Sequence, residues 1–407
     1  PPPFFIHPDA GIRAAQESRG LGDVYKRQVF KQNGYKTALY GKWHSGMQYP
    51  YHPKARGFDD FYGFCSGHWG NYFAPELEAN GKIVKGKGYV TDDLTQHALD
   101  FIKTNKKQPF FLYLSLNIPH SPMQVPDKNW IKFKDKDIIQ KGTKTKIDMD
   151  KAFGTNASKG PDHTRAALAM CENIDWNVGR IIQTLEEQNI IENTIIIYLS
   201  DNGPNGHRWN GGMKGIKGST DEGGTRSPMI ISWKGNIPEG KQVKTIASGI
   251  DLLPTLIDLT GIKTKPKNKL DGLNLRKLIY EEDISWPDRY IYSYWRGRLS
   301  LRSQDFRLDN NNQLFNMEKD PNQLQNVSST YKEIFDVMKK AKIKWENELL
   351  PEGHLWELLT FTSDEYLKLS VNARGPAGRS IMEHWLKRIK SRSRSTDCWE
   401  LVMLDNQ

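Results

Sequence analysis

The chain has 407 residues, of which 37% are hydrophobic and 26% are charged, and its mean hydropathy is −0.67. These values exclude a short peptide and a wholly disordered chain, and the length is enough for one large α/β domain plus a smaller one. No apolar run is long enough to cross a bilayer as a helix. The three cysteines, Cys65, Cys171 and Cys398, are too few for a disulfide framework and lack the spacing of a zinc site.

The net charge of +10 is spread along the chain. Residues 1–28 contribute +1 and residues 374–407 contribute +3, which leaves +6 for the sequence between them. A modest positive field favours an anionic substrate, although an ordinary solvated surface would have the same charge.

The first 28 residues show no helical or strand periodicity. Within them, Ser18–Gln28 resembles the conceptual translation of a sequencing adapter, and the alternative is a natural basic loop. We therefore interpret residues 1–28 as a non-native or adapter-derived segment and expect the natural sequence to begin near Val29. No signal peptide is visible in this segment, which gives no information about localisation.

From Val29 onward, helical periodicities alternate with short apolar runs that are typical of strands. The run 109–116 predicts a strand buried on both faces of a sheet, and 193–201 predicts another buried strand. The expected elements, in chain order, are the end of a helix with a turn at Gly34, a strand over 37–40, a helix over 92–104, a strand over 109–116, a polar surface excursion over 123–163, a helix over 165–188, strands over 193–201 and 228–233, and a helix over 251–259 with Pro254 in its first turn.

This alternation predicts an α/β fold with a mostly parallel sheet flanked by helices. Ligands of such sheets bind at the carboxyl ends of the strands. Four polar residues, Lys42, His44, His120 and Asp201, follow predicted strands. We therefore expect them to converge on one crevice.

The pattern changes near Trp286. Short strands, a turn at 310–312 and a helix near 331–348 predict a small C-terminal α+β subdomain with an antiparallel sheet. We therefore divide the chain into a catalytic domain over 29–285, this subdomain over 286–350 and an unassigned tail over 351–407. The tail contains the strongly basic run 387–394, and it is either natural or the product of a frame error.

Two motifs place cationic side chains after predicted strands. In GKWHSG, residues 41–46, Lys42 and His44 are alternate residues that face the same way in an extended chain, so both could address one anion. His120 stands between two prolines, and a rigid backbone suits a positioned acid or base. The alternatives are a surface Lys-x-His pair and a structural loop histidine.

Two further motifs follow the strand over 193–201. Asp201 and Asn202 offer a carboxylate and an amide oxygen, which suit a hard cation such as Ca²⁺, although Asp-Asn turns are common at strand ends. The glycine-rich stretch 209–224 contains Lys214 and Lys217, whose compact ammonium groups suit sulfate or phosphate. Its Gly–Lys spacing excludes a P-loop, and the alternative is a flexible surface loop.

In this order, the four motifs resemble those of the formylglycine-dependent sulfatase family of the alkaline-phosphatase-like superfamily. G-K-W-H-x-G is matched by residues 41–46, the proline-flanked histidine by His120, D-N-G by 201–203, and K-G-x-x-x-E-G-G by 217–224. Two later stretches, 250–255 and 314–321, also resemble the family. The resemblance covers the chain from about Val29 to about Leu350.

The resemblance implies a catalytic role for four residues. Lys42 and His44 would contact the nucleophile and the sulfate, while His120 and Lys217 would bind the sulfate and assist the leaving oxygen.

It also implies that Asp201 and Asn202 are two of the ligands of Ca²⁺, which neutralises the sulfate oxygens. Three residues between this pair and Lys217 are placed to contact a sugar, namely His207, Arg208 and Asn210.

In this family the nucleophile is a formylglycine made from the Cys or Ser of C/S-x-P-x-R, which lies upstream of G-K-W-H together with an Asp-Asp pair of metal ligands. None of the three cysteines begins this motif. We therefore expect the motif to be absent from the chain and to have been lost, with the remaining Ca²⁺ ligands, by truncation before Val29. The chain alone would then be inactive, and a natural pseudoenzyme is the alternative.

The resemblance predicts a sulfatase that hydrolyses a sulfate ester of a carbohydrate and is periplasmic or secreted, as family members usually are. One alternative is a phosphodiesterase or phosphatase of the same superfamily, which would use Ser or Thr with two zinc ions. Another is a non-catalytic binder of sulfated polysaccharide. No sequence motif supports binding of nucleic acid.

Overall fold

The structure is a computed structural model that describes residues 29–67, 69–137, 161–206, 210–263, 269–281 and 284–349. The strands are β1 (Lys36–Lys42), β2 (Asp60–Phe64), β3 (Glu76–Ala79), β4 (Lys82–Lys85), β5 (Phe110–Ser115), β6 (Ile196–Leu199), β7 (Met229–Ser232), β8 (Ile291–Trp295), β9 (Arg298–Arg302), β10 (Phe306–Leu308) and β11 (Leu314–Asn316). The α-helices are α3 (Val90–Asn105), α4 (Asp127–Trp130), α6 (Pro161–Glu187), α7 (Glu222–Thr225), α8 (Leu252–Leu259), α9 (Arg276–Tyr280) and α10 (Lys332–Leu349). None of the helices in these ranges is long and apolar enough to cross a membrane.

The largest sheet has five strands in the order β4-β3-β2-β1-β5. β1 lies between β2 and β5 and runs parallel to both, whereas β3 and β4 form an antiparallel extension. The register pairs Gly41 with Ser115 and Lys42 with Phe64, so the three parallel strands end at the same edge. The predicted α/β class is confirmed, and the carboxyl-end edge is where this class binds ligands.

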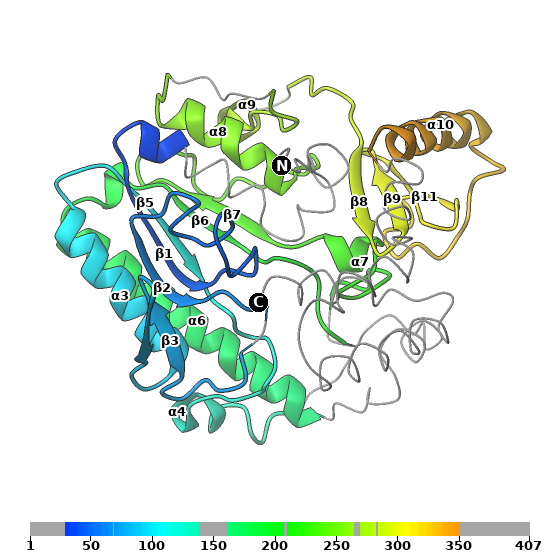
Figure 1. Cartoon of the computed structure of the whole chain (residues 1–407). Helices are drawn as coiled ribbons and strands as arrows, with labels where there is room; N and C mark the ends of the chain where they lie inside the picture. Colours follow the sequence, from blue (N-terminus) through cyan, green and yellow to red (C-terminus); the bar gives the residue numbers. More distant parts are fainter. Residues whose placement is uncertain are drawn as a thin grey trace, which may run out of the picture.

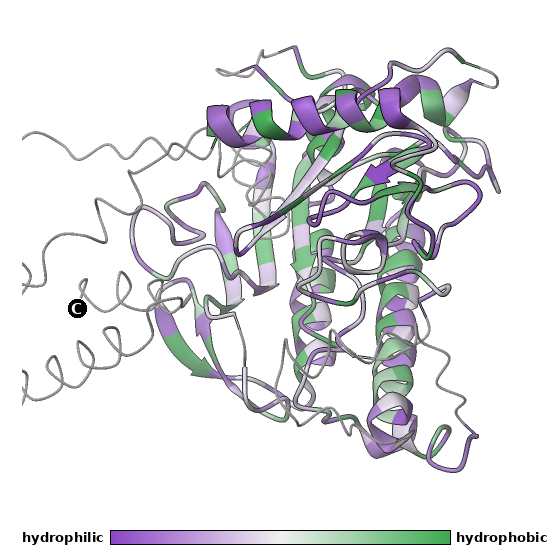
Figure 2. Ribbon diagram, turned by 90° about the vertical axis from the view of Figure 1, so that its right-hand side faces the viewer, coloured by the Kyte–Doolittle hydropathy of each residue, from purple (hydrophilic) through white to green (hydrophobic). Residues whose placement is uncertain are grey.

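Alternate residues of β1 and β2 face opposite sides of the sheet, as the two-residue period of a strand requires. One side packs against α3 and α6, whose apolar stripes complete the largest buried cluster. Figure 1 shows both helices beside this sheet, and Figure 2 shows hydrophobic residues along the strands and in stripes on the long helices. The other side forms a smaller buried cluster of Leu39, Trp43, Phe58, Phe61 and Cys65.

The helices expected over 92–104, 165–188 and 251–259 are present as α3, α6 and α8. The strand over 109–116 differs from expectation, because all six residues of β5 are only partly buried. Its hydrogen-bonded neighbour in the five-stranded sheet is β1 alone, so its other edge carries no partner strand within the described residues. An edge strand is covered less completely than a central one, which accounts for the difference.

The strands expected over 193–201 and 228–233 also differ from expectation. They form β6 and β7, an antiparallel pair separate from the five-stranded sheet, and Leu199 and Ile230 are exposed to 46% and 60%. Only the four-residue helix α7 is described between them, whereas a parallel connection usually has a longer crossover helix. The chain therefore returns antiparallel to β6.

The C-terminal subdomain contains the four-stranded antiparallel sheet β11-β10-β9-β8 and the helix α10, as the sequence predicts. Leu301, Leu308, Leu314 and Met338 form its core between the sheet and α10. In Figure 1 this subdomain lies at the upper right, beside α7. Residues 1–28, 138–160 and the tail over 351–407 lie outside the described residues.

Gly41 allows β1 and β5 to approach closely just before the strand ends. Its φ is +119°, and a Cβ atom there would lie 2.0 Å from the carbonyl oxygen of Ser115. We expect Gly41→Ala to lower the free energy of unfolding by about 3 kcal/mol or more, because backbone strain and overpacking add together. Chemical denaturation measures this loss.

Gly34→Ala is the matched control. Gly34 also has a positive φ, +81°, but a Cβ atom at this position would have no neighbouring atom within 4 Å. This variant should cost only about 1 kcal/mol. Equal losses in the two variants would contradict the close approach of Gly41 to Ser115.

Candidate functional site

The first part of the site is the end of β1. Lys42 is its last residue, and the hydroxyl of Ser115 donates a hydrogen bond of 2.6 Å to the Lys42 carbonyl oxygen. His44 follows with a positive φ of 50°, and its N–H donates to the Cys65 carbonyl oxygen at 3.2 Å. A Cβ atom on Gly67 would lie 2.1 Å from Nε2 of His44, so a glycine at 67 leaves room for this ring.

The second part is the segment after β5, which ends at the same edge as β1. Nδ1 of His120 lies 2.7 Å from the Ser121 carbonyl oxygen. Because a carbonyl oxygen only accepts, Nδ1 carries the proton, and the lone pair of neutral His120 is on Nε2. The hydroxyl of Tyr72 donates to the His120 carbonyl oxygen at 3.0 Å, and this hydrogen bond fixes the backbone of His120.

The third part consists of the turn after β6 and the glycine-rich stretch, which are joined by backbone hydrogen bonds. Gly203 N–H donates to the Gly224 carbonyl oxygen at 3.1 Å, and Lys217 N–H donates to the Pro204 carbonyl oxygen at 2.9 Å. A Cβ atom on Gly203 would lie only 1.8 Å from the Gly223 carbonyl oxygen. The D-N-G turn and the K-G-x-x-x-E-G-G stretch therefore form one unit.

Electrostatic interactions connect this unit to the end of β1. Burial lowers the pKa of Lys42, the Asp201 carboxylate raises it, and the Lys217 ammonium lowers it, with a net result below the usual value. The charges of Asp201 and Lys217, from two other segments, thus act on Lys42 at the carboxyl-end edge. Two cations with one carboxylate leave a net positive charge, which suits an anion.

The contacts of Asp201 and Asn202 are compatible with binding of a hard cation. The Asn202 amide donates through Nδ2 to the Gly203 carbonyl oxygen at 2.8 Å, so its second polar atom, Oδ1, is an acceptor. Asp201, which is exposed, supplies a carboxylate in the adjacent position. These two oxygen donors fit Ca²⁺, which binds six to eight oxygens, as part of a larger set.

A buried ion pair holds the glycine-rich unit against the C-terminal subdomain. Glu222, the first residue of α7, accepts hydrogen bonds from Nε and Nη2 of Arg307 in β10 at 3.1 and 2.7 Å. The side chains are exposed to only 6% and 4%. Burial alone would raise the pKa of Glu222, but the charges of Arg307 and Arg302 outweigh it and lower that pKa below its usual value.

Further contacts surround this pair. Nη1 of Arg307 and the hydroxyl of Ser300 both donate to the Thr220 carbonyl oxygen. The side chain of Gln323 accepts from Glu222 N–H at 2.9 Å and donates to Asp221 at 3.1 Å. The subdomain therefore fixes the backbone only three residues after Lys217. Sequence reasoning gave Arg307 no role, and its only signal was a lone arginine in an otherwise apolar strand.

Of the three residues expected to contact a sugar, His207 and Arg208 lie outside the described residues. The amide of Asn210 donates to the carbonyl oxygens of Met213 and Gly215 at 2.8 and 3.2 Å, so it braces the glycine-rich stretch. Its Oδ1 is buried and has no hydrogen-bond partner among the described residues.

The expectation that the sequence contains no C/S-x-P-x-R motif is wrong, because residues 285–289 read S-W-P-D-R. Here Arg289 forms an ion pair of 2.5 Å with the buried Asp251. Trp286 packs on an apolar cluster that also contacts Ile195 and Trp233. These two residues lie at the start of β6, whereas Asp201 follows its end. This stretch therefore stabilises the structure far from the carboxyl-end edge.

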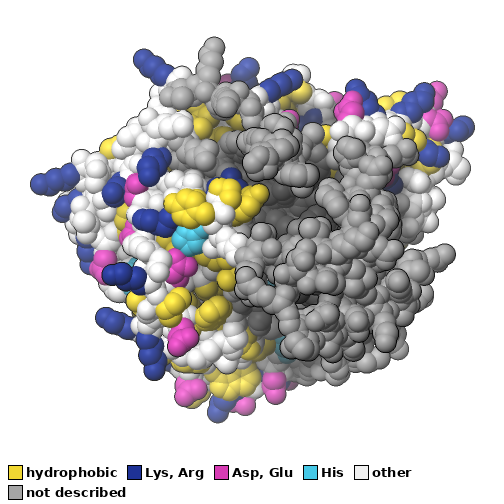
Figure 3. All heavy atoms as spheres, viewed as in Figure 1, with side chains coloured by type: hydrophobic (Ala, Val, Ile, Leu, Met, Phe, Trp, Pro, Cys, Tyr) yellow, Lys and Arg dark blue, Asp and Glu magenta, His cyan; other side chains and the backbone are white. Residues whose placement is uncertain are grey.

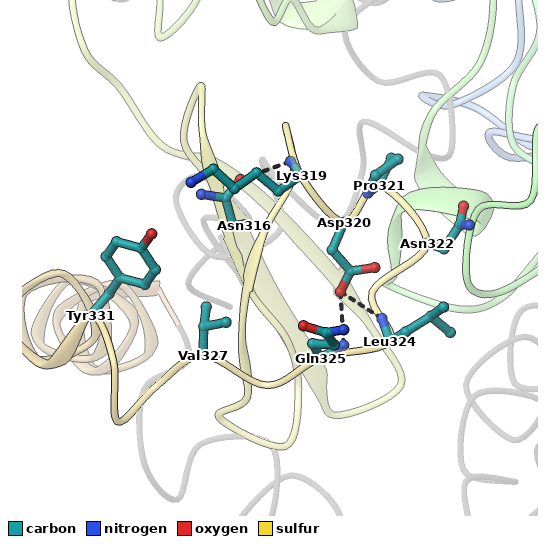
Figure 4. A pocket seen from close by; sticks show the side chains of 9 residues that line it. All are labelled: Asn316, Lys319, Asp320, Pro321, Asn322, Leu324, Gln325, Val327 and Tyr331. Atoms are coloured by element: carbon teal, nitrogen blue, oxygen red, sulfur yellow. Dashed lines mark hydrogen bonds between the residues drawn. The ribbon is translucent and has the colours of Figure 1, made fainter.

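A pocket of about 330 Å³ lies in the C-terminal subdomain (Figure 4). Its lining residues are Asn316, Lys319, Asp320, Pro321, Asn322, Leu324, Gln325, Val327 and Tyr331. The Asp320 carboxylate faces the N–H groups of Leu324 and Gln325, so the most acidic group of the pocket is already paired. The pocket contains none of the residues at the carboxyl-end edge.

Basic side chains are scattered on the described part of the face in Figure 3, mainly along its left and upper rims. They form no single basic patch there. The local charges of Lys42 and Lys217, more than the net charge of the chain, therefore favour an anion at the site.

The fold and the site define a class of α/β protein with a net positive site at the carboxyl ends of parallel strands. The chain matches the family described as Sulfatase over residues 27–262, and the family described as N-sulphoglucosamine sulphohydrolase, C-terminal, over 217–348. The first match covers more than half of the 407 residues. The chain belongs to the sulfatase family.

Curated relatives agree with this assignment. The chain is 31% identical over 314 residues to the uncharacterized sulfatase YdeN of Escherichia coli, covering 69% of this chain and 52% of that protein. It is 30% identical over 297 residues to the N-acetylgalactosamine-6-sulfatase of Mus musculus, covering 66% and 51%. The chain thus spans about half the length of these relatives.

Solved structures share the fold. The crystal structure of Ps i-CgsB in complex with k-i-k-neocarrahexaose has a TM-score of 0.68 and 29% identity, with 89% of each chain covered. The structure of BT4656 in complex with its substrate D-glucosamine-2-N,6-O-disulfate has a TM-score of 0.61 and 21% identity, covering 81% of this chain and 82% of that one. The latter likeness concerns the fold alone.

The Glu222–Arg307 pair yields a direct stability prediction. We expect Arg307→Met to lower the free energy of unfolding by about 3 to 5 kcal/mol, because it leaves a buried carboxylate without its main partner. Arg226→Ala is the control, since Arg226 lies 3.6 Å from the same carboxylate but is 65% exposed, and its loss should cost at most about 1 kcal/mol. Denaturant unfolding that ranks the two variants equally would contradict this account.

Proposed function

We propose that this chain forms the sulfate-binding part of a sulfatase that acts on a sulfated carbohydrate. The observation that carries the proposal is the position of Lys42 at the carboxyl-end edge, where the charges of Asp201 and Lys217 act on it. Two ammonium groups there would contact the oxygens of a sulfate ester, and His120 follows the neighbouring strand at the same edge.

The residues would act by charge and position. As the S–O bond of a sulfate ester breaks, negative charge grows on the oxygens, and cations held in place stabilise that state. Lys42 and Lys217 supply such cations, and His120, with its Nδ1 proton directed to the Ser121 carbonyl oxygen, has Nε2 to exchange a proton with the leaving oxygen. Asp201 and Asn202 would hold Ca²⁺, which supplies further charge to neutralise the sulfate.

The carbohydrate substrate is supported by similarity. The Ps i-CgsB structure, at 29% identity, is described in complex with an oligosaccharide, and N-acetylgalactosamine-6-sulfatases are among the relatives at 30% identity. A phosphatase or phosphodiesterase is the rival, because a phosphonate monoester hydrolase of Agrobacterium radiobacter shares the fold at 19% identity. Lys42 favours sulfate, since it occupies the end of β1 where the rival would place a metal ligand.

Calorimetric titration of the chain with a sulfated carrageenan oligosaccharide, in the presence of Ca²⁺, tests this proposal. We expect saturable binding that Lys42→Ala weakens about 10-fold or more, because a desolvated charge pair contributes more than an exposed one. Lys36→Ala is the control, since Lys36 begins the same strand, is exposed and lies at its opposite end.

Two outcomes would contradict the proposal. One is equal binding of the desulfated oligosaccharide, and the other is equal loss in the Lys36 and Lys42 variants. Sulfate release is measured in the same samples. We propose that none occurs, because the S-W-P-D-R serine lies at the wrong end of β6, and turnover abolished by Ser285→Ala would overturn that assignment.

The lowered pKa of Lys42 predicts how binding depends on pH. Only the protonated ammonium attracts sulfate, and its pKa lies below the usual 10.5. Binding should therefore weaken as the pH rises through a range below 10.5, and this loss should be absent in Lys42→Ala. The folded state disfavours protonation of Lys42. The contribution of Lys42 to the free energy of unfolding is therefore fully present above its unfolded pKa, and it is lost as the pH falls through its folded pKa. Titrations at a series of alkaline pH values measure the effect on binding.

A further inference from the structure

Three side chains with metal-binding atoms converge on the far side of the sheet from α3 and α6. His52 comes from the segment between β1 and β2, Cys65 follows β2, and Glu78 lies in β3. One ligand atom from each lies within 4.8 Å of the others, and Nε2 of His52 is 2.8 Å from Oε1 of Glu78. We propose that these three residues bind a divalent transition metal of the Zn²⁺ type, at a site separate from Asp201 and Asn202.

The ligand set suits such an ion. Thiolate, imidazole and carboxylate are the three donors that Zn²⁺ takes in proteins, at about 2.3, 2.0 and 2.1 Å. Two of these ligands on a tetrahedral Zn²⁺ are therefore about 3.3 to 3.6 Å apart. The observed separations, from 2.8 to at most 4.8 Å, differ from these values by little more than about 1 Å, which rotation of the side chains would supply. The fourth position would hold water.

The surroundings orient two of the ligands. Lys54 N–H points at Nδ1 of His52 at 3.3 Å, and Gly81 N–H donates to Oε1 of Glu78 at 2.9 Å. Outer contacts of this kind fix ligand orientation in metal sites. Without metal, Nε2 of His52 therefore carries the proton and donates it to Glu78, and the metal would take the place of that proton.

The third ligand lies at an apolar wall. Cys65 is 7% exposed and packs with Trp43, Phe58 and Phe61, and the Phe61 ring meets the His52 ring edge-to-face at 5.4 Å. Burial and the Glu78 charge raise the pKa of Cys65 to about 12, so binding would release the thiol proton to solvent. Such a wall limits the access of water to the site and strengthens the metal–ligand attraction.

A metal here would join the segment after β1 to β2 and β3. That segment already contacts the end of β1, because the Trp43 indole donates to the Tyr51 carbonyl oxygen at 2.9 Å. The carbonyl oxygen of Cys65 in turn accepts the His44 N–H. The ion would thus stabilise the backbone that positions His44.

Titration of the full chain with Co²⁺, as a coloured substitute for Zn²⁺, tests the proposal. We expect one equivalent to produce a thiolate-to-cobalt charge-transfer band, and Zn²⁺ to displace it and raise the melting temperature. Cys65→Ser should abolish the band, while the combined Cys171→Ser and Cys398→Ser variant should retain it. The band identifies a thiolate ligand, so metal bound at Asp201 and Asn202 does not produce it.

Cys65→Ser also separates the metal site from a simple hydrogen bond. This nearly isosteric change preserves the 2.8 Å contact between His52 and Glu78, so the metal-free variant should melt as the metal-free parent does. Glu78→Gln, which keeps the thiol and the imidazole, should weaken Co²⁺ binding at least about 100-fold, more than the loss of an outer contact. The absence of a saturable band in the parent, or its persistence in Cys65→Ser, would overturn the proposal.

Discussion

The buried ion pair between Glu222 and Arg307 is the interaction on which the site depends. A carboxylate at 6% exposure is costly unless it is paired and hydrogen-bonded. Here Arg307 supplies both charge and hydrogen-bond donors, and Arg302 adds a second positive charge. Because Glu222 follows Lys217 by five residues, the pair fixes the glycine-rich stretch to the C-terminal sheet. The subdomain is therefore part of the site's support, although it contributes none of the residues at the carboxyl-end edge.

Close backbone approaches supply the remaining constraint. Gly41 lets β1 and β5 end side by side, and Gly203 lets the turn after β6 lie directly on α7. Any larger residue would push these segments apart. Lys42, Lys217 and Asp201 consequently interact although they are far apart in the chain, and their opposed effects on the Lys42 pKa follow from that closeness.

The sequence predicted the helices well, because α3, α6 and α10 have apolar stripes whose spacing depends on local residues alone. It also placed Lys42, His120 and Asp201 at strand ends. It misjudged β5, β6 and β7, since an apolar run does not reveal which strands lie beside it. Arg307 and the His52–Cys65–Glu78 cluster were missed for a related reason. The residues that interact in each case are distant in sequence, so no local pattern predicts the interaction.

The motif at 285–289 shows that a sequence pattern can also match where the structure gives it another role. The letters S-W-P-D-R agree with the nucleophile motif of the family, but Arg289 is paired with Asp251 and Trp286 packs beside the distal end of β6. Position in the fold, and not the order of letters, decides which chemistry a residue performs.

Selenate is a heavy-atom analogue of sulfate, and its anomalous diffraction locates it without ambiguity. A crystal of the chain soaked in selenate, with data collected at the selenium edge, tests most directly whether the carboxyl-end edge is the sulfate site. The account predicts the strongest peak within contact of the ammonium groups of Lys42 and Lys217. Selenate bound only elsewhere, or no peak at this edge at saturating concentration, would contradict it.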